Sequence, residues 1–259
     1  MSIPRAIFID MDGTLLNHEN NQVPKTAVDA LYHAHEKGIM IFIATGRNKN
    51  EFDRISALNN LPIDGFVTMN GAYCYAGDEV IFKNPLHPNA VAMLVDQITK
   101  DPFPCIFCEL DDMYINITNS LVDYLQKTVN LPIPKICGPH KALNAEIFQI
   151  AAFGGEKEEK FLRSLPYSKL TRWLDGGFDL VNKTANKWNG ILHMLKYFKI
   201  SPAETAAVGD AENDIEMLAN AGDSVAMGNA NESVKKCAKF ITSHVDDNGL
   251  AKALEYLLS

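Results

Sequence analysis

The segment that most constrains the fold is residues 39–44, an apolar run without a single polar side chain. A strand with one wet face alternates apolar and polar residues, so an unbroken apolar run is typical of a parallel strand buried on both faces. Strand-like segments also lie at 6–9 and 65–69, and helices are predicted between them, over 24–38 and 50–59. This alternation of strands and helices predicts right-handed crossovers and a doubly wound sheet.

The middle third of the chain, from about residue 83 to residue 184, shows a different pattern. Strand-like segments come there in pairs on either side of turn residues, which indicates β-hairpins. The pairs are 106–108 with 114–116, and 170–173 with 178–181. Amphipathic helices are predicted over 88–99 and 120–129. Paired strands with helices indicate a separate α+β domain.

The alternating pattern returns from residue 186. Its segments are a helix that ends near 198, strands at 205–208, 224–227 and 240–242, and a closing helix over 250–258. We therefore predict an α/β fold whose core is a doubly wound, Rossmann-like parallel sheet formed by residues 1–82 and 185–259. Residues 83–184 are predicted to form an inserted α+β domain, here called the cap.

Charge and composition exclude several classes of partner. The 259 residues carry a net charge of −8 and no long basic run, which argues against binding to nucleic acid or to an acidic membrane surface. No apolar run approaches the roughly 18–20 residues that span a bilayer. Five scattered cysteines suit a reducing compartment. We expect a cytoplasmic protein that acts on a small molecule, as a monomer or small homo-oligomer.

Polar residues follow the strands of the predicted core. They are Asp10 and Asp12 after the first strand, Thr45 and Gly46 after the second, Asn70 and Gly71 after the third, and Asp210, Asn213 and Asp214 after the strand at 205–208. Ligands of open α/β sheets bind outside the carboxyl ends of the strands, so we expect these groups to lie together. Asn70 and Gly71 could equally form a simple turn.

Four carboxylates at one sheet edge would repel one another unless a cation offsets their charge. Ligands that are all oxygen atoms favour a hard ion that also binds phosphate, which indicates Mg²⁺. Favourable acids at a helix N-terminus would explain one of these residues but not the whole set.

In this order, the strand-end segments resemble the motifs of the haloacid dehalogenase-like superfamily of phosphohydrolases. The similarity is greatest to the Cof-type branch, whose members carry an α+β cap between the second and third motifs. The resemblance implies that Asp10 is the nucleophile and Asp12 the general acid/base. It also implies that Thr45 hydrogen-bonds a phosphoryl oxygen and that Lys187 neutralises phosphoryl charge.

The same resemblance implies how the metal and the substrate are held. Mg²⁺ would be bound by Asp10, by the backbone carbonyl of Asp12 and by Asp210, with Asp214 acting through water and Asn213 helping to orient it. The groups expected on the substrate side are Gly46, Asn70, Gly71 and Asn213 in the core, with Asp179 and Asn182 in the cap. A purely structural role for the two cap residues stays open.

Two details depart from the family pattern or stay open. Relatives often have a glycine-containing turn before the lysine, which this chain lacks, so Lys183 is a rival to Lys187. Lys187 is preferred because an apolar helix starts directly after it. Arg47 follows the Thr-Gly pair, and its role is undecided.

These inferences predict a Mg²⁺-dependent phosphatase that hydrolyses small phosphorylated metabolites, such as sugar phosphates, through an aspartyl-phosphate. One alternative is a phosphosugar mutase of the same superfamily, which returns the phosphoryl group to the substrate. A second, non-enzymatic alternative is a regulator that senses a phosphorylated metabolite.

Overall fold

The computed structural model describes residues 3–17, 22–52, 58–129 and 131–259. The chain divides into two compact units. The core unit draws on Met1–Arg47, Glu51–Lys83 and Asn186–Ser259, and the cap unit on Asn48–Asn50 and Asn84–Ala185. Within the described ranges, no helix is both long enough and apolar enough to cross a membrane.

The core unit is built on an eight-stranded sheet with the order β14-β13-β12-β1-β2-β3-β4-β5. Its strands are β1 (Ala6–Ile9), β2 (Met40–Ala44), β3 (Gly65–Thr68), β4 (Tyr73–Ala76), β5 (Glu79–Lys83), β12 (Thr205–Gly209), β13 (Asp223–Ala226) and β14 (Phe240–Ile241). The six strands other than β4 and β5 pair in parallel. The chain leaves β1 toward β2 and β3, and later returns to place β12 and β13 on its other side. This reversal confirms the predicted doubly wound core and puts its switch point between β1 and β12.

The β4–β5 hairpin is an extension that the sequence analysis did not predict. Both pairings of β4 are antiparallel, with β3 on one side and β5 on the other. The turn between the two strands uses Gly77 in the left-handed region, with φ of +55°. The hairpin thus closes one edge of an otherwise parallel sheet.

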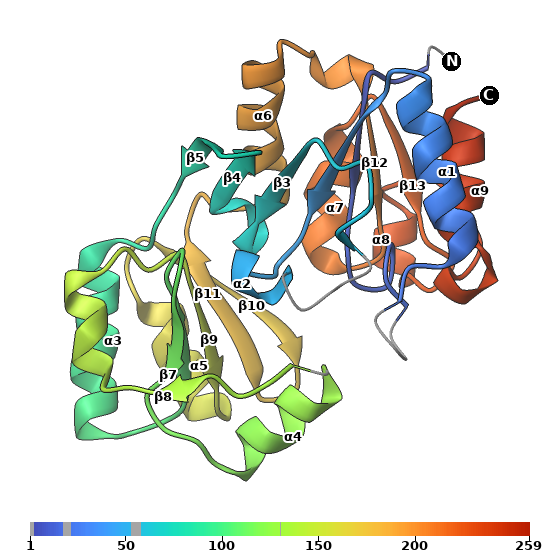
Figure 1. Cartoon of the computed structure of the whole chain (residues 1–259). Helices are drawn as coiled ribbons and strands as arrows, with labels where there is room; N and C mark the ends of the chain where they lie inside the picture. The colour runs from blue at the N-terminus through green and yellow to red at the C-terminus, as the bar shows by residue number, and fades with distance from the viewer. Residues whose placement is uncertain (1–2, 18–21, 53–57, 130) are drawn as a thin grey trace. The chain divides into compact units, whose positions relative to one another are not determined.

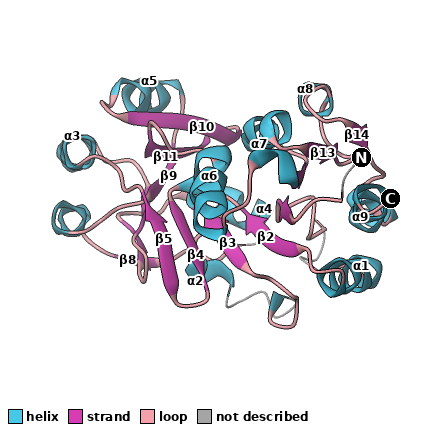
Figure 2. Ribbon diagram, turned by 90° about the horizontal axis from the view of Figure 1, so that it is seen from above, coloured by secondary structure: helices cyan, strands magenta, loops and turns pink. Residues whose placement is uncertain are grey.

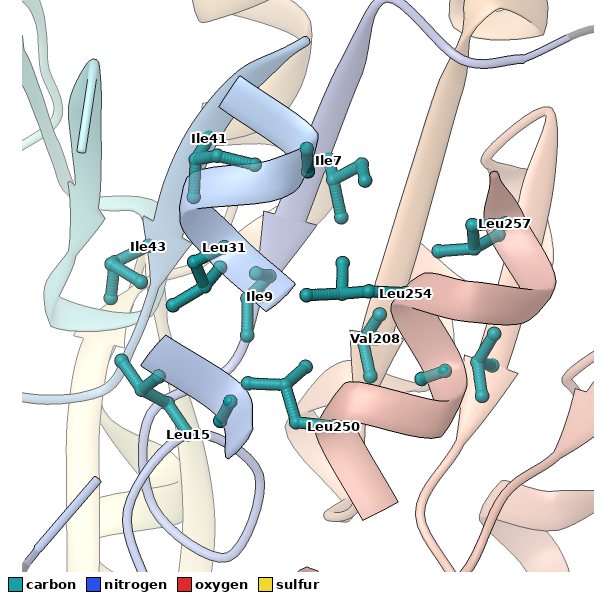
Figure 3. Close-up of a cluster of buried hydrophobic side chains, with 14 of the residues drawn as sticks. Ile7, Ile9, Leu15, Leu31, Ile41, Ile43, Val208, Leu250, Leu254 and Leu257 are labelled. Atoms are coloured by element: carbon teal, nitrogen blue, oxygen red, sulfur yellow. The ribbon is translucent and has the colours of Figure 1, made fainter. Parts of the chain in front are cut away.

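Helices cover both faces of the core sheet (Figures 1 and 2). Ile7 and Ile9 of β1 pack in one cluster with α1 (Lys25–Glu36) and α9 (Gly249–Leu257), which lie side by side. Figure 3 shows Ile7 and Ile9 among leucines of these two helices. Phe8 points to the other face, where it packs with residues of α6 (Lys187–Phe198) and α7 (Ile215–Asn220). Because alternate residues of β1 enter different clusters, the strand is buried on both faces.

Short helices complete the core unit. They are α8 (Glu232–Lys235) and the 3₁₀ helices η2 (Met69–Gly71), η4 (Pro202–Glu204), η5 (Glu212–Asp214) and η6 (Val245–Asp247). The short helix α2 (Lys49–Phe52) begins in the segment that groups with the cap unit and ends in the core unit. The helix predicted over 50–59 is seen only at its start, because residues 53–57 lie outside the described residues.

The cap unit has its own six-stranded sheet, with the order β10-β11-β9-β6-β7-β8. Its elements are α3 (Pro88–Lys100), β6 (Cys105–Cys108), β7 (Met113–Ile115), α4 (Ser120–Thr128), β8 (Lys135–Ile136), η3 (Pro139–Asn144), β9 (Gln149–Phe153), α5 (Glu156–Ser164), β10 (Ser168–Leu174) and β11 (Gly177–Asn182). The predicted hairpins are confirmed as the antiparallel pairs β6–β7 and β10–β11. Leu94 of α3 packs with Ile150 and Leu180 of the sheet in a separate hydrophobic core.

Candidate active site

Three carboxylates gather at the switch point of the core sheet. The N–H of Asp10 donates to the carbonyl of Val208 at 2.9 Å, so Asp10 continues the β1–β12 ladder by one residue. Asp210 directly follows β12, and Asp214 ends η5. Oxygen atoms of Asp10, Asp210 and Asp214 lie within 4.8 Å of one another. The structure therefore brings together acids from two segments that are 200 residues apart in the chain.

Lys187 inserts its ammonium group between two of these acids. It is the first residue of α6, whose N-cap Asn186 accepts a hydrogen bond from the N–H of Asn189. The Nζ atom donates to Asp10 Oδ1 at 2.5 Å and to Asp214 Oδ1 at 2.6 Å, and the side chain is fully buried. The rival Lys183 is exposed. Of the two lysine candidates, Lys187 is thus the one that contacts Asp10.

Asp214 is held from two sides. Its Oδ1 accepts from Lys187, and its Oδ2 accepts from the backbone N–H groups of Asp210 at 3.0 Å and Ala211 at 2.9 Å. A Cβ atom on Gly209 would lie 2.6 Å from the Asp214 carboxyl carbon, so this close approach requires glycine. These contacts favour an indirect role for Asp214, in which it orients Lys187 and the turn that carries Asp210.

The charges at this edge are not balanced. Lys187 places one ammonium group against Asp10 and Asp214, and Asp210 lies beside them, so within this cluster three acids face one lysine. Burial and the charge of Asp214 raise the pKa of Asp10 well above its ordinary value, against a smaller lowering by Lys187. Burial alone would lower the pKa of Lys187, but the charges of Asp10 and Asp214 outweigh it and raise this pKa above its ordinary value. Lys187 is therefore a permanent cation.

The donor set fits a divalent cation. Asp10 Oδ2 is buried and has no hydrogen-bond partner among the described residues. A buried carboxylate oxygen without a partner is costly, and an ion bound there would offset both this cost and the excess negative charge. The oxygen atoms of Asp10 and Asp210 match the all-oxygen ligation of a hard cation.

Asp12 is paired with Arg47, whose role could not be decided from the sequence. Arg47 donates from Nε to Asp12 Oδ2 at 2.9 Å and from Nη2 to Asp12 Oδ1 at 2.5 Å, which is a bidentate pair. The Arg47 side chain is 10% exposed and that of Asp12 41% exposed. Burial would lower the pKa of Arg47, but the hydrogen bonds and charge of Asp12 raise it. Arg47 thus fixes the direction of a carboxylate that is still open to solvent.

Asn70 is joined to Thr45 through the backbone and to Asn213 through its side chain. Thr45 is fully buried, and its Oγ accepts from the N–H of Arg47 at 3.0 Å while its hydroxyl can still donate. The N–H of Asn70 donates to the carbonyl of Thr45 at 3.1 Å, and its side-chain Oδ1 accepts from Asn213 at 3.0 Å. A Cβ on Gly46 would stand 3.3 Å from the Asn70 amide. Asn70 therefore connects three of the strand-end segments.

Gly71 has a packing role of its own. It ends a turn of three successive left-handed residues, in which Met69, Asn70 and Gly71 have φ of 48°, 54° and 83°. A Cβ on Gly71 would lie 2.0 Å from the carbonyl oxygen of Asn186, so the turn packs directly against the start of α6. This contact helps to place Lys187.

The two cap residues differ from each other. Asp179 lies half-buried in the middle of β11, opposite Thr171 of β10 and Ala151 of β9. Asn182 ends that strand, and its amide donates to the carbonyl of Pro85 at 2.8 Å while its Oδ1 accepts from Thr184. Asn182 therefore has a structural task where the chain enters and leaves the cap unit.

Two polar residues near Asp210 were not identified from the sequence. Thr14 Oγ1 lies 3.3 Å from Asp210 Oδ1, and Asn229 Nδ2 lies 3.0 Å from Asp210 Oδ2. Asn229 follows the carboxyl end of β13, so the strand-end rule that found the other residues could also have found it.

Known proteins share this architecture and sequence pattern. A family model described as haloacid dehalogenase-like hydrolase matches residues 7–254. The solved structure of BT4131, described as a HAD subclass IIB sugar phosphatase, has a TM-score of 0.86 and 36% identity, covering 97% of this chain and 98% of its own. A structure from work on a trigonal-bipyramidal intermediate in a phosphoryl-transfer superfamily has a TM-score of 0.90 and 37% identity, covering 98% of each chain. BT1666 of Bacteroides thetaiotaomicron, described among HAD phosphatases, has a TM-score of 0.88 and 31% identity, covering 98% of this chain and 95% of its own.

Proposed function

The chain belongs to the haloacid dehalogenase-like hydrolase family, and we propose that it is a Mg²⁺-dependent phosphatase acting through an aspartyl-phosphate. Its substrates are small phosphorylated metabolites, sugar phosphates among them. The observation that carries the proposal is the state of Asp10, a buried carboxylate with Lys187 on one oxygen and no described partner on the other. The similarity to a protein described as a sugar phosphatase supports the substrate class.

Asp10 is the proposed nucleophile. One of its oxygens attacks phosphorus, and a bond from Asp10 to phosphorus forms as the bond to the leaving oxygen breaks. The fixed ammonium of Lys187, adjacent to Asp10, offsets charge on the transferring phosphoryl group. The hydroxyl of Thr45 donates to one phosphoryl oxygen.

Asp12 is the proposed general acid and base. Its carboxyl group gives a proton to the leaving alkoxide, and then removes a proton from the water that attacks phosphorus. This second step frees phosphate and restores Asp10. We propose that Arg47 positions Asp12 for both transfers, because the bidentate pair fixes the carboxylate plane.

Mg²⁺ would be held by Asp10, by the backbone carbonyl of Asp12 and by Asp210. When bound, it supplies a positive charge that offsets the excess negative charge of the cluster and polarises a phosphoryl oxygen. Asp214 contributes through Lys187, which it contacts directly.

Substrate selection is assigned to the cap unit. Every residue given a chemical role above lies in the core unit, so residues 84–185 are left to distinguish one leaving group from another. Asp179 is the first candidate for a contact with a polar leaving group, and Asn182 the second.

The direct test is a phosphate-release assay with Mg²⁺ on a generic aryl phosphate, followed by a panel of phosphorylated metabolites. We expect release from the aryl ester and faster release from one or a few sugar phosphates. No release from any compound would contradict the proposal, and so would a sugar phosphate that is isomerised without loss of phosphate.

A further inference from the structure

Asn229 contacts the metal-binding edge of the core unit through all the polar groups of its side chain. Its Nδ2 donates to Asp210 Oδ2 at 3.0 Å and to the carbonyl oxygen of Gly13 at 2.9 Å. Its Oδ1 accepts from the N–H of Val245 at 3.0 Å. One amide therefore connects the turn after β1, the turn after β12 and the start of η6.

Thr14 contacts the other oxygen of the Asp210 carboxylate. Its Oγ1 lies 3.3 Å from Asp210 Oδ1, and the side chain is fully buried. With Asn229 on Oδ2 and Thr14 on Oδ1, both oxygens of Asp210 have a neutral partner from another segment of the chain. Two such contacts restrict the rotation of the carboxylate about its χ angles.

The neutrality of these partners is significant. A lysine or arginine on Asp210 would orient it equally well but would repel a cation, as Coulomb's law requires at such distances. The other two acids of the cluster are paired with the ammonium of Lys187 instead. Lys187 thus contacts Asp10 and Asp214 with a charged group, whereas Asn229 and Thr14 contact Asp210 with uncharged groups.

We propose that Asn229, assisted by Thr14, is a positioning residue that presents the Asp210 carboxylate to the divalent cation. This inference rests on the proposed Mg²⁺-dependent function. Groups that hydrogen-bond to metal ligands and hold them in place typically contribute 10- to 100-fold to metal affinity or activity. Because the contact at 3.0 Å is shorter than the one at 3.3 Å, Asn229 has the larger effect.

The experiment is a calorimetric titration of Mg²⁺ into chelator-treated, metal-free protein. We expect Asn229→Ala to raise the Mg²⁺ dissociation constant by about 10- to 100-fold and Thr14→Val to raise it by a smaller factor. Asn231→Ala is the matched control for the first variant, because Asn231 lies two residues away and caps α8 without contacting the cluster. Thr26→Val, at a hydroxyl bonded to Asn248, is the control for the second. Both controls should bind Mg²⁺ like the wild type.

The Mg²⁺ dependence of activity is a second measurement, and it distinguishes a positioning role from a merely structural one. In both test variants, the Mg²⁺ concentration for half-maximal activity should rise, while kcat at saturating Mg²⁺ should return toward the wild-type value. If wild-type protein binds no Mg²⁺, the proposed function fails. If the wild type binds Mg²⁺ and the variants bind it equally well, the inference about Asn229 and Thr14 is overturned. If Asn229→Ala does not fold, the Mg²⁺ affinity of Thr14→Val alone tests the inference.

Discussion

Lys187 in the core unit and Lys141 in the cap unit each bind two carboxylates at nearly the same distances. Lys187 lies 2.5 Å from Asp10 and 2.6 Å from Asp214, and Lys141 lies 2.6 Å from both Glu109 and Asp112. The clusters differ in burial, because the Lys187 side chain is fully buried whereas that of Lys141 is 35% exposed. Distance between charged atoms alone therefore does not distinguish the proposed catalytic cluster from the lysine cluster of the cap unit.

Charge balance separates the two clusters further. In the cap unit Lys135 is 2.8 Å from Asp112, so two lysines face two acids. Hydrogen bonds from Lys135 and Lys141 lower the pKa of Asp112 to about 2, whereas burial and like charge raise the pKa of Asp10. Salt bridges therefore accompany opposite pKa shifts in the two units. The excess negative charge of the core cluster favours a bound cation.

The largest expected effect comes from Asp10→Asn. The change keeps size and shape but removes the nucleophilic charge, so phosphate release should fall by a factor on the order of 10⁴ to 10⁶. Asp112→Asn makes the same change at the other lysine-bound acid and should keep wild-type activity. Assays of both variants on an aryl phosphate, with circular dichroism to verify folding, check this. Equal activity in the two variants would contradict the claim that burial and charge balance make the core cluster, and not the cap cluster, catalytic.

Removal or exchange of the metal should affect the Lys187 cluster of the core unit and leave the Lys141 cluster of the cap unit unchanged. Chelation should abolish activity, and Ca²⁺ should inhibit, because it takes more ligands at longer distances and can draw in both oxygens of Asp10. Since the pKa of Asp10 is raised in the metal-free protein, protons compete with the metal and the apparent Mg²⁺ affinity should fall as pH falls. Titrations at several pH values measure this. Full activity after exhaustive chelation would show that the carboxylates serve another purpose.

Arg47→Met should have an intermediate effect. Without the bidentate pair, Asp12 loses its fixed direction, and kcat should fall by about 10- to 100-fold. The loss should be greater for an alkyl phosphate, whose leaving group needs a proton, than for an aryl phosphate. Arg5→Met, at a surface ion pair with Glu204, is the control. An equal loss on both esters would indicate that Arg47 does not act through Asp12.

Variants in β11 should change preference rather than chemistry. Asp179→Ala should alter the ranking of metabolite phosphates while leaving the rate on a small aryl phosphate close to wild type. Asn182→Ala should lower thermal stability instead, because its amide holds Pro85 and Thr184. A substrate panel and a melting curve for each variant test this. An unchanged ranking for Asp179→Ala would place specificity on other residues of the cap unit.

The smallest effect is expected for the stability of Asp112→Asn. The folded pKa of Asp112 lies below its ordinary value, so its stabilisation is present above about pH 4 and is lost as pH falls toward 2. The cluster is partly exposed, so the loss in unfolding free energy at neutral pH should stay below about 1 kcal/mol. Urea unfolding at pH 7 and pH 3 should show a smaller difference from wild type at the lower pH. A difference that grows toward acid would contradict this assignment.

The fold was predictable where apolar periodicity is strong. The run at 39–44 became β2, and both hairpins of the cap unit matched their turn signals. The β4–β5 hairpin was missed although Gly77-Asp78 between two strand-like runs is a local hairpin signal. Only its antiparallel pairing with β3 depends on the folded sheet.

That strand-end residues gather in the candidate site was predictable from the sequence, but the contacts between them were not. The rule that ligands bind at the carboxyl ends of strands located Asp10 and Asp210. It could not show that Arg47 pairs with Asp12, 35 residues away, or that Asn229 reaches Gly13 across 216 residues. Such contacts depend on how turns from distant segments pack, and so they emerge only from the folded chain.

The central claim is that the phosphoryl group passes through Asp10. Asp12→Asn should slow the attack of water, so that an aryl phosphate leaves the enzyme phosphorylated. After rapid mixing with Mg²⁺ and acid quench, borohydride reduction would convert the acyl phosphate to homoserine, and peptide mass spectrometry would locate it. We predict homoserine at position 10 and nowhere else. Burst release of the aryl alcohol with no reduced residue, or with one at another carboxylate, would contradict the account.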